Sequence, residues 1–468
     1  MIHFSLLKYG RGIIVLVLGS LFAGCSAHYP VNEPIDKIDS VSGYRSATAE
    51  TSDVRSDSLL VALAFSGGGT RAAAFSYGIL EALRDVTIHW DGRERRLIDE
   101  VDTISSVSGG SFTAAYYGLF GDRIFEDYEE KFLKKDVQGH LSGSLWKPWT
   151  WPRIGSSLYG RSDLAAEYYD EILFEHKTFA DILENQGPFI QINATEVAQG
   201  AQFTFIQGIF DLICSDLETF PVSRAVTASS AVPVLFSSIT IDNHAGECGY
   251  QLPPWVEKAL ADRDITSRRR HLAEKYVQFL DRENQPYLHL YDGGLTDNLG
   301  VRSFMNRLVL IGDAWRLAKL TGKGNVKRIL FIVVNAQAET KAHYSRFAES
   351  VPLLDTITGA TSIPLNEYTF ESLVALKHEM DKFGKNFVEG RCAERMRNGE
   401  DSTGCDDFEA QLVIVDIDSL KDAEQREKLK QLPTSFRLAP EEVDELRQAA
   451  RTILLDSPGY QKFLDDMK

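Results

Sequence analysis

The chain has 468 residues, which is enough for two or three domains with a sizeable core. Its 44% hydrophobic and 25% charged residues are ordinary for a globular protein. The formal net charge of −17 argues against a nucleic-acid-binding protein, which normally needs a basic face. The same charge argues against electrostatic recruitment to an anionic lipid surface.

Residues 1–24 have the pattern of a cleavable export signal. A basic stretch precedes the apolar run 12–23, which is shorter than the ~20 residues that a membrane span needs. The following Leu21-Phe22-Ala23-Gly24-Cys25 resembles a bacterial lipoprotein signal, in which the cysteine is lipidated and becomes the new N-terminus. An uncleaved anchor or an ordinary secretory signal fits this pattern less well. Ser26, in place of an aspartate, favours the outer membrane, facing the periplasm.

The first strand-like run of the chain ends in a glycine-rich turn. Residues 59–65 are continuously apolar, as buried parallel strands are, and Gly67, Gly68 and Gly69 follow before the helix-compatible stretch 72–84. Without Cβ atoms, successive N–H groups can point into one concavity, and the helix N-terminus adds partial positive charge. The spacing fits neither a dinucleotide fingerprint nor a P-loop, so the pattern favours an oxyanion hole.

Ser108 lies in a second turn of small residues, Ser106-Val107-Ser108-Gly109-Gly110. The apolar run 97–104 precedes this turn and is compatible with a strand, and residues 111–119 are compatible with a helix. This is the layout of a nucleophile elbow, which lifts a serine hydroxyl clear of a sheet. Ser106 replaces the first glycine of the G-x-S-x-G pattern, and Ser-Gly pairs are common in ordinary turns. On this segment alone both interpretations stay open.

An aromatic stretch follows the elbow. Trp146, Trp149, Trp151 and Tyr159 occur among prolines and glycines. Such a stretch suits a loop at a membrane interface, or a lid over the site. A large loop that its aromatic side chains pin into the core is equally compatible.

Four cysteines remain after Cys25, and export would place them where disulfides form. Four cysteines allow three pairings. We favour the pairing of neighbours, in which each disulfide closes a local loop: Cys214 with Cys248, and Cys392 with Cys405. Free buried thiols are the alternative. The spacing indicates no zinc site.

A third glycine turn, Asp292-Gly293-Gly294, follows the strand-like residues 287–290. Asp292 could accept the proton of Ser108 as a general base, although an ordinary turn after a strand is compatible with the same residues. His289 would point to the opposite face of the strand from Asp292, so we do not expect it to bridge to Asp292. A histidine-based triad stays open, because one sequence does not give spatial proximity.

The three glycine turns resemble, in this order, those of the patatin-like phospholipase family. The resemblance runs from about Leu59 to Gly300 and includes Ala228-Ser229-Ser230-Ala231-Val232-Pro233. It implies an α/β fold of three layers, in which helices flank a mostly parallel central sheet. It also implies a dyad of Ser108 and Asp292, an oxyanion hole at Gly67, Gly68 and Gly69, and a mechanism without a metal ion or other cofactor.

The implied function is that of a lipid acyl hydrolase of the phospholipase A or lysophospholipase type. Its substrate would be a phospholipid or another acyl-ester lipid. A general carboxylesterase is the alternative, as is a catalytically silent lipoprotein that binds lipid or a protein. Arg71 would orient the glycine loop or meet a lipid phosphate, and an ion pair with a surface acid is equally compatible.

The domain boundaries follow from composition and from this resemblance. Residues 1–24 are the expected signal peptide, and the polar residues 25–57 are expected to be a flexible tether. The catalytic domain is expected over 58–336, where strand-like and helix-like stretches alternate. Residues 337–468 are expected to form a C-terminal α/β region that packs on it. The elements expected near these boundaries are strands at 189–194, 328–336 and 410–417, and helices at 365–383 and 439–455.

Overall fold

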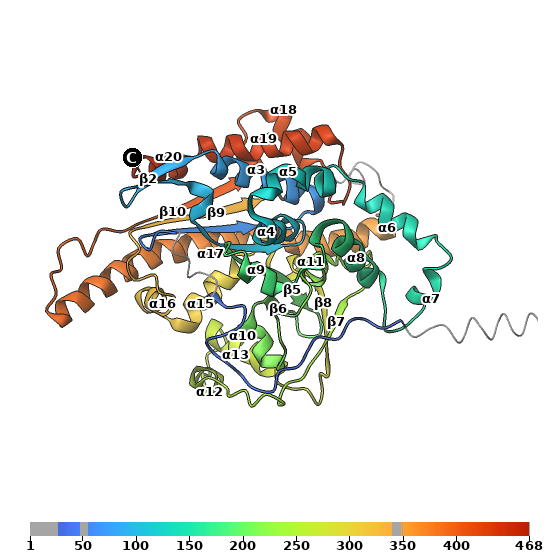
Figure 1. The fold of residues 1–468 in the computed structure, drawn as a ribbon, viewed down its shortest axis with the longest axis horizontal. Coiled ribbons are helices and arrows are strands. Elements are labelled where there is room, and N and C mark those ends of the chain that lie inside the picture. The colour runs from blue at the N-terminus through green and yellow to red at the C-terminus, as the bar shows by residue number, and fades with distance from the viewer. Residues whose placement is uncertain (1–26, 47–54, 339–347, 349, 468) are drawn as a thin grey trace, which may run out of the picture.

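The computed structural model describes residues 27–46, 55–338, 348 and 350–467, and it has a central sheet between layers of helices (Figure 1). The strands are β1 (Leu59–Phe65), β2 (Thr87–Trp90), β3 (Arg93–Arg96), β4 (Val101–Val107), β5 (Phe189–Glu196), β6 (Ala201–Phe205), β7 (Ile239–Asp242), β8 (Tyr287–Asp292), β9 (Arg328–Asn335) and β10 (Glu409–Asp416). The α-helices of the first half are α3 (Gly69–Arg84), α4 (Gly109–Phe120), α5 (Ile124–Tyr128), α6 (Val137–Leu145), α7 (Trp151–Ile154), α8 (Arg161–Tyr169), α9 (Phe179–Glu184), α10 (Gln207–Phe210) and α11 (Val222–Ser230). Those of the second half are α12 (Pro254–Leu260), α13 (Arg268–Phe279), α14 (Gly294–Asp297), α15 (Arg302–Ile311), α16 (Ala314–Leu320), α17 (Leu353–Asn398), α18 (Ala423–Lys430), α19 (Pro440–Asp456) and α20 (Pro458–Asp465).

The central sheet has the strand order β10-β9-β1-β4-β5-β8-β7, and β6 pairs with β5. Neighbours from β10 to β5 are parallel, whereas β8 pairs antiparallel with β5 and β7, and β6 pairs antiparallel with β5. The predicted fold class, an α/β protein with a mostly parallel sheet flanked by helices, is thus confirmed. Because parallel strands share one direction, the carboxyl ends of β1 and β4 lie at the same edge of the sheet.

Both faces of the sheet are largely buried at the central strands β1, β4, β5 and β9, which explains the continuous apolar runs of β1 and β9. Leu63 and Phe65 of β1 join a large cluster with residues of α3, α4 and α19. Ala64, between them, faces the other way and packs with Met305 of α15 and Leu376 of α17. Figure 1 shows α3 and α19 on one side of the sheet, and α15, α16 and α17 on the other.

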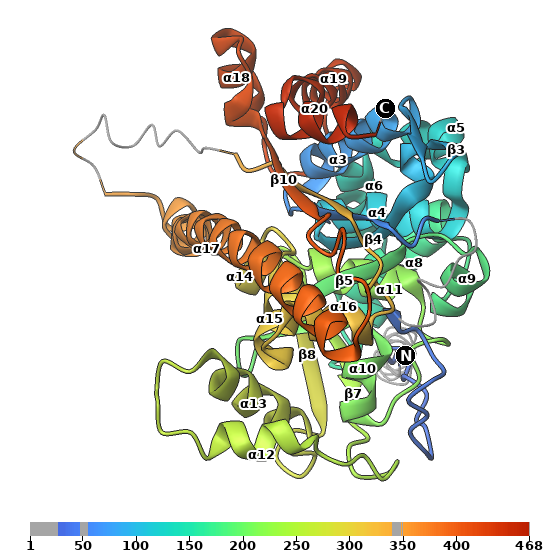
Figure 2. The same cartoon turned by 90° about the vertical axis from the view of Figure 1, so that its left-hand side faces the viewer.

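The C-terminal residues extend the same sheet. Strand β10 pairs in parallel with β9, with Glu409 opposite Arg328. Helix α19 packs closely on α3, since a Cβ atom at Gly78 would lie 2.4 Å from the backbone oxygen of Arg447. Turned by 90°, the molecule shows α17 on one side of these strands and α18, α19 and α20 on the other (Figure 2). Residues 350–467 therefore build on the sheet that carries the first half of the chain.

The apolar run 97–104 differs from its expected form. Leu97–Glu100 form a short 3-10 helix, and strand β4 begins only at Val101. Leu97 and Ile98 are buried nevertheless. Burial therefore explains why these residues are apolar, while the turn into β4 is decided by tertiary packing.

Residues 27–46, which the sequence assigned to a flexible tether, instead pack along the domain. Tyr44 is fully buried, and its hydroxyl group donates to the backbone oxygen of Ile190 at 3.0 Å and accepts from the Ile190 N–H at 2.8 Å. The Asn32 amide donates to Ser215 Oγ at 2.8 Å. These hydrogen bonds offset the low hydrophobicity on which the prediction of a tether rested.

Candidate active site

Ser108 is held in a strained backbone conformation between β4 and α4. Its φ of 49° and ψ of −120° are rare for a residue with a side chain. A Cβ atom at Gly109 would lie 2.0 Å from the backbone oxygen of Gly69, and one at Gly110 would lie 2.7 Å from Phe65 Cβ. The two glycines after Ser108 therefore allow the close packing that a nucleophile elbow needs.

Ser106 is accommodated at the position where the elbow pattern has glycine. Its side chain is fully buried, and its hydroxyl group donates to the backbone oxygen of Gln191 on β5 at 3.2 Å. The hydroxyl group is thus satisfied by the neighbouring strand.

Asp292 lies across β5 from the elbow. Val107 pairs with Asn193 of β5, and Asp292, at the end of β8, pairs with the next residue, Ala194. The Ser108 hydroxyl group interacts with the Asp292 carboxylate and lowers its pKa. The topology therefore brings together two residues that are far apart in the sequence.

The environment of Asp292 suits a general base. Burial raises the pKa of Asp292 to about 6, against the opposing effect of hydrogen bonds from the Gly294 N–H and the Ser108 hydroxyl group. The Gly294 N–H lies 2.8 Å from Asp292 Oδ1 and fixes the orientation of the carboxylate. A carboxylate of this pKa is a much better base toward a serine than a solvated one, and it is still ionised at neutral pH.

Ser229 on α11 forms a hydrogen bond with the backbone of the elbow. Its Oγ atom accepts the Ser108 N–H at 2.8 Å and donates to the backbone oxygen of Asn193 at 2.6 Å. The Ser111 hydroxyl group completes this network at 3.0 Å. The sequence indicated the segment around Ser229 but gave it no role, because only the tertiary structure brings α11 beneath α4.

The three glycines after β1 do not contribute equally to the predicted oxyanion hole. The Gly67 N–H donates to the backbone oxygen of Asn298 at 2.9 Å, so it is not free for a substrate oxygen. Within the described residues, the N–H groups of Gly68 and Gly69 have no hydrogen-bond partner. The φ angles of 141° and 61° at these two glycines favour the absence of a side chain.

Gly109 is a further candidate donor that sequence reasoning missed. It is the residue after Ser108, and it begins α4 just as Gly69 begins α3. The closeness of Gly109 to Gly69 places the N-termini of both helices at the elbow, where their dipoles favour negative charge. Its place after Ser108 in the elbow pattern was the sequence signal for this role.

Arg71 has a structural environment. It is 2% exposed, Nε donates to the backbone oxygen of Ala336 at 2.8 Å, and Nη2 donates to Thr434 Oγ1 at 3.1 Å. Nη1 donates to the backbone oxygen of Leu432 at 2.5 Å. Burial lowers the pKa of Arg71 to about 10. Of the readings that the sequence left open, these contacts fit an arginine that orients the glycine loop and joins it to the C-terminal region.

The C-terminal region also covers the site. The Ser435 backbone oxygen accepts the N–H of Thr70 at 2.9 Å, and the Phe436 ring packs edge-on against that of Phe112 on α4. Ser108 is 4% exposed and Asp292 is 8% exposed.

His289 faces away from Asp292. Its side chain is exposed and contacts Thr240 Oγ1 at 3.1 Å, while Leu288, Leu290 and Asp292 occupy the buried face of β8. The Asp292 carboxylate accepts the Gly294 N–H and interacts with Ser108. In the same residues, no group of three His, Cys, Asp or Glu side chains has the arrangement of a metal site.

The tryptophans that follow the elbow are on the surface. Trp146, Trp149 and Trp151 are 81%, 73% and 58% exposed, whereas Tyr159 is buried. The tryptophans therefore do not pin this loop into the core. The predicted lipidation site, Cys25, lies outside the described residues, in which no helix has the length and apolar character to cross a bilayer.

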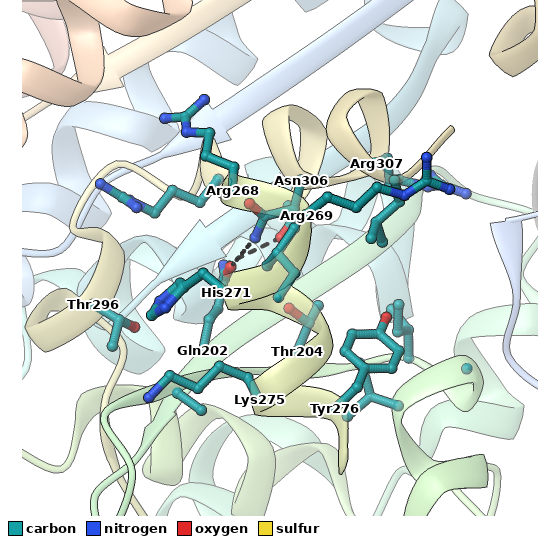
Figure 3. A pocket seen from close by; sticks show the side chains of 18 of the residues that line it. Gln202, Thr204, Arg268, Arg269, His271, Lys275, Tyr276, Thr296, Asn306 and Arg307 are labelled. Carbon is teal, nitrogen blue, oxygen red and sulfur yellow. Dashed lines mark hydrogen bonds between the residues drawn. The ribbon is translucent and has the colours of Figure 1, made fainter. Parts of the chain in front are cut away.

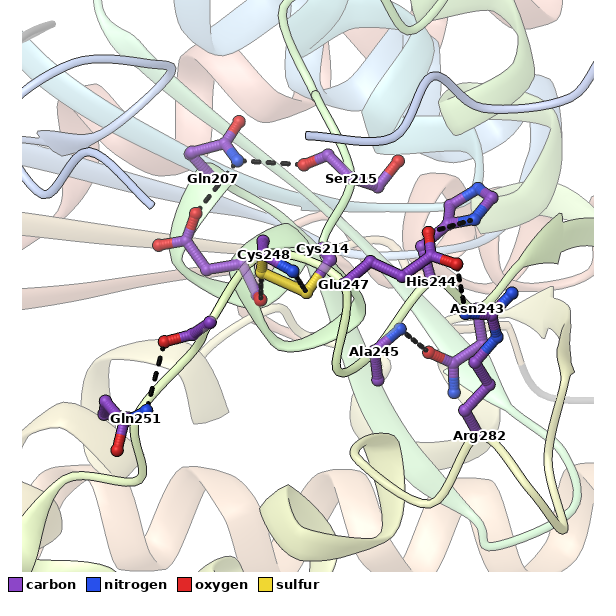
Figure 4. The surroundings of a disulfide bond; sticks show 12 residues. Gln207, Cys214, Ser215, Asn243, His244, Ala245, Glu247, Cys248, Gln251 and Arg282 are labelled. Atoms are coloured by element: carbon purple, nitrogen blue, oxygen red, sulfur yellow. Dashed lines mark hydrogen bonds and ion pairs between the residues drawn. A yellow bond between two sulfur atoms is a disulfide. The ribbon is translucent and has the colours of Figure 1, made fainter. Parts of the chain in front are cut away.

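The structure contains two disulfides, Cys214–Cys248 and Cys392–Cys405, which are the pairs that the sequence favoured. Figure 4 shows the first of them, which ties the loop after β7 to the turn after α10. The Cys248 N–H also points to Cys214 Sγ at 3.2 Å.

About half of the chain matches a known protein family. A family model described as patatin-like phospholipase matches residues 63–305, which contain Ser108 and Asp292. A search of curated proteins found no match. Among solved structures, human GIVD cytosolic phospholipase A2 is similar over 62% of this chain and 48% of its own, with 14% identity and a TM-score of 0.36.

A second structure of that human protein, in complex with methyl gamma-linolenyl fluorophosphonate inhibitor and terbium chloride, is 15% identical with a TM-score of 0.31. It matches over 62% of this chain and 43% of its own. The match thus spans less than half the length of these solved chains.

Proposed function

This chain belongs to the patatin-like phospholipase family, and from that premise we propose that it hydrolyses acyl esters of phospholipids or lysophospholipids through Ser108 and Asp292. Family membership supports a lipid ester hydrolase in general. The observation that carries the finer proposal is the interaction of Ser108, which has a strained backbone, with the buried Asp292 carboxylate, whose pKa is raised to about 6.

In the proposed reaction, Ser108 Oγ attacks the ester carbonyl carbon while its proton passes to Asp292. The N–H groups of Gly68, Gly69 and Gly109 stabilise the charge on the carbonyl oxygen, and each such donor contributes roughly 3–4 kcal/mol. The tetrahedral intermediate then expels the alcohol, which takes the proton from Asp292. Asp292 next removes a proton from water, which attacks the acyl-enzyme carbonyl carbon. The second tetrahedral intermediate then releases the fatty acid and expels Ser108 Oγ, which takes the proton back from Asp292.

The test uses the chain from Ser26 onward with a defined phospholipid and with a short-chain ester. We expect fatty-acid release by the wild type and none by Ser108→Ala. Ser106→Ala is the matched control, because it removes a neighbouring buried hydroxyl group outside the dyad. Release that survives Ser108→Ala would exclude the serine mechanism, and hydrolysis of the short ester alone would indicate a general carboxylesterase. Hydrolysis of neither would favour a binding lipoprotein.

We also propose that a lipid on Cys25 anchors the protein to the outer membrane, facing the periplasm. The described chain begins two residues later, at Ala27, whose backbone oxygen accepts from Ser156 Oγ at 2.6 Å. Trp149 and Trp151 lie a few residues before Ser156 and are exposed. The anchor and these tryptophans would then face the same bilayer, where tryptophan is favoured at the interface.

Fractionation of expressing cells tests the anchor. We expect the wild type in the outer-membrane fraction and Cys25→Ser among the proteins that wash off, because several acyl chains hold a protein firmly and none remains in the variant. A Cys25→Ser protein that stays in the membrane fraction would contradict the anchor.

A further inference from the structure

A cavity of about 560 Å³ lies between α13, α15 and β6, apart from the candidate active site. Neither Ser108 nor Asp292 lines it. Figure 3 shows the labelled side chains around it, among which Asn306 donates to Gln202 Oε1 at 3.3 Å. The cavity is therefore a separate site, whose lining contains neither residue of the candidate active site.

The charge of its walls is one-sided. The basic residues that line it are Arg268, Arg269, His271 and Lys275 on α13, Arg302 and Arg307 on α15, and Arg316 on α16. No aspartate or glutamate lines it, although acidic residues outnumber Lys and Arg in the chain by 67 to 50. Like charges held together repel one another, so such a grouping favours an anion between them.

These arginines and Lys275 form no ion pair within the described part of the chain, whereas Arg270, beside them on α13, pairs with Glu274 at 2.9 Å. The Arg302 guanidinium lies 3.9 Å from the centroid of the Tyr368 ring, and its buried Nε has no partner. The buried Nε of Arg269 has none either. Buried donors are normally satisfied, so this cavity has unused capacity to bind an acceptor.

Other groups near these cations leave that capacity in place. Arg307 Nη2 donates to Ser46 Oγ at 2.8 Å, and Lys275 Nζ donates to the Gln199 backbone oxygen. Asp297 is buried, accepts the Arg302 backbone N–H at 2.7 Å and interacts electrostatically with the Arg302 side chain, but it does not line the cavity. Neutral acceptors and this single carboxylate do not balance the charge of all the cations that line the cavity.

The rest of the lining is apolar. Ile206, Ile209, Trp255, Leu272, Phe279 and Leu310 contribute to the wall. A small inorganic anion would leave this surface uncovered, whereas a ligand with an anionic head and an apolar body would cover it.

We propose that this cavity binds the phosphate-bearing head group of an anionic amphiphile at a site separate from Ser108. The guanidinium groups supply charge-assisted, bidentate hydrogen bonds to the phosphate oxygens, and the apolar wall receives the beginning of the chain. The proposal does not depend on hydrolysis at Ser108.

The test measures binding to the Ser108→Ala chain by calorimetry, so that no hydrolysis interferes and failure of the proposed function leaves the result readable. The probes are a monoacylglycerol phosphate and a monoacylglycerol phosphocholine, both below their critical micelle concentrations, and inorganic phosphate. We expect the monoacylglycerol phosphate to bind tightest, because it carries the largest charge and an apolar chain.

The test variant is Arg268→Gln with Arg316→Gln, since both side chains line the cavity and are exposed, so that folding is not disturbed. We expect it to weaken binding roughly ten- to hundredfold. The control, Arg270→Gln with exposed Arg93→Gln, removes the same charge outside the cavity and should keep the affinity within about twofold.

Binding of inorganic phosphate as tight as that of the amphiphile, with the same dependence on the variant, would assign the anion site to free phosphate. Failure of every anionic probe to bind would overturn the proposal. So would binding that the test variant and the control weaken equally.

Discussion

Replacing Asp292 with asparagine tests the central electrostatic argument through stability as well as activity. Burial raises the pKa of Asp292 to about 6 from its ordinary 3.8, so the folded protein keeps a proton that the unfolded chain releases between these pH values. Protons favour the folded state in this window. The contribution of Asp292 to stability is therefore fully present below pH 3.8 and is lost as the pH rises through 6.

A shift of about two pKa units corresponds to roughly 3 kcal/mol, of which about 2–3 kcal/mol falls between pH 4 and pH 8. Asparagine has a similar shape and no charge, so Asp292→Asn removes this pH dependence. We expect the variant to gain about 2–3 kcal/mol of unfolding free energy relative to the wild type on going from pH 4 to pH 8. Any effect of the substitution that does not depend on pH cancels in this difference.

Urea unfolding of both proteins at the two pH values measures this quantity. The same substitution at exposed Asp36 is the control, for which we expect a difference near zero. Fatty-acid release by Asp292→Asn should fall by roughly 10²–10⁴ in kcat/KM, because the general base is lost. Equal pH dependence in Asp292→Asn and wild type would refute the raised pKa, and with it the argument that burial activates this carboxylate.

Three further outcomes are expected. Hydrolysis by the wild type should rise about tenfold per pH unit below pH 6 and level off above it, because only the ionised base accepts a proton; a flat profile from pH 4 to 8 would count against this base. Gly109→Ala should abolish activity and lower the thermal midpoint, because its Cβ atom would lie 2.0 Å from a backbone oxygen, whereas Gly143→Ala, with no atom within 4 Å, should match the wild type in both measurements. Ser229→Ala should lower kcat roughly tenfold with little change in KM, because the Ser108 N–H loses its acceptor; a change in KM alone would show that Ser229 contacts substrate instead.

Local sequence patterns predict many of the strands and helices of the fold. Residues 59–65 and 328–335 form parallel strands, as their continuous apolar runs predict, because a strand covered on both faces needs apolar residues at every position. The helix at 440–456 likewise agrees with the predicted one to within a residue. The prediction of a strand over 97–104 was wrong for Leu97–Glu100, because buried apolar residues also occur in the short helix before β4.

Local sequence patterns did not predict the cavity. The run Arg268-Arg269-Arg270-His271 was its sequence signal, but a charge run is usually a solvated face. Its partners on α15 and α16 follow 30 or more residues later, and only packing brings them to one cavity.

The sequence by itself determined the candidate chemistry of Ser108 and Asp292, because an elbow and a glycine turn need small residues at fixed local spacings. Only the tertiary structure decided how these residues work together. It places Asp292 across β5 from Ser108 and buries its carboxylate. It also engages the Gly67 N–H, whereas those of Gly68 and Gly69 have no hydrogen-bond partner in the described part of the chain. Segments far apart in the chain supply the burial and the hydrogen-bond partners of a side chain. The pKa of that side chain depends on these surroundings rather than on its sequence neighbours.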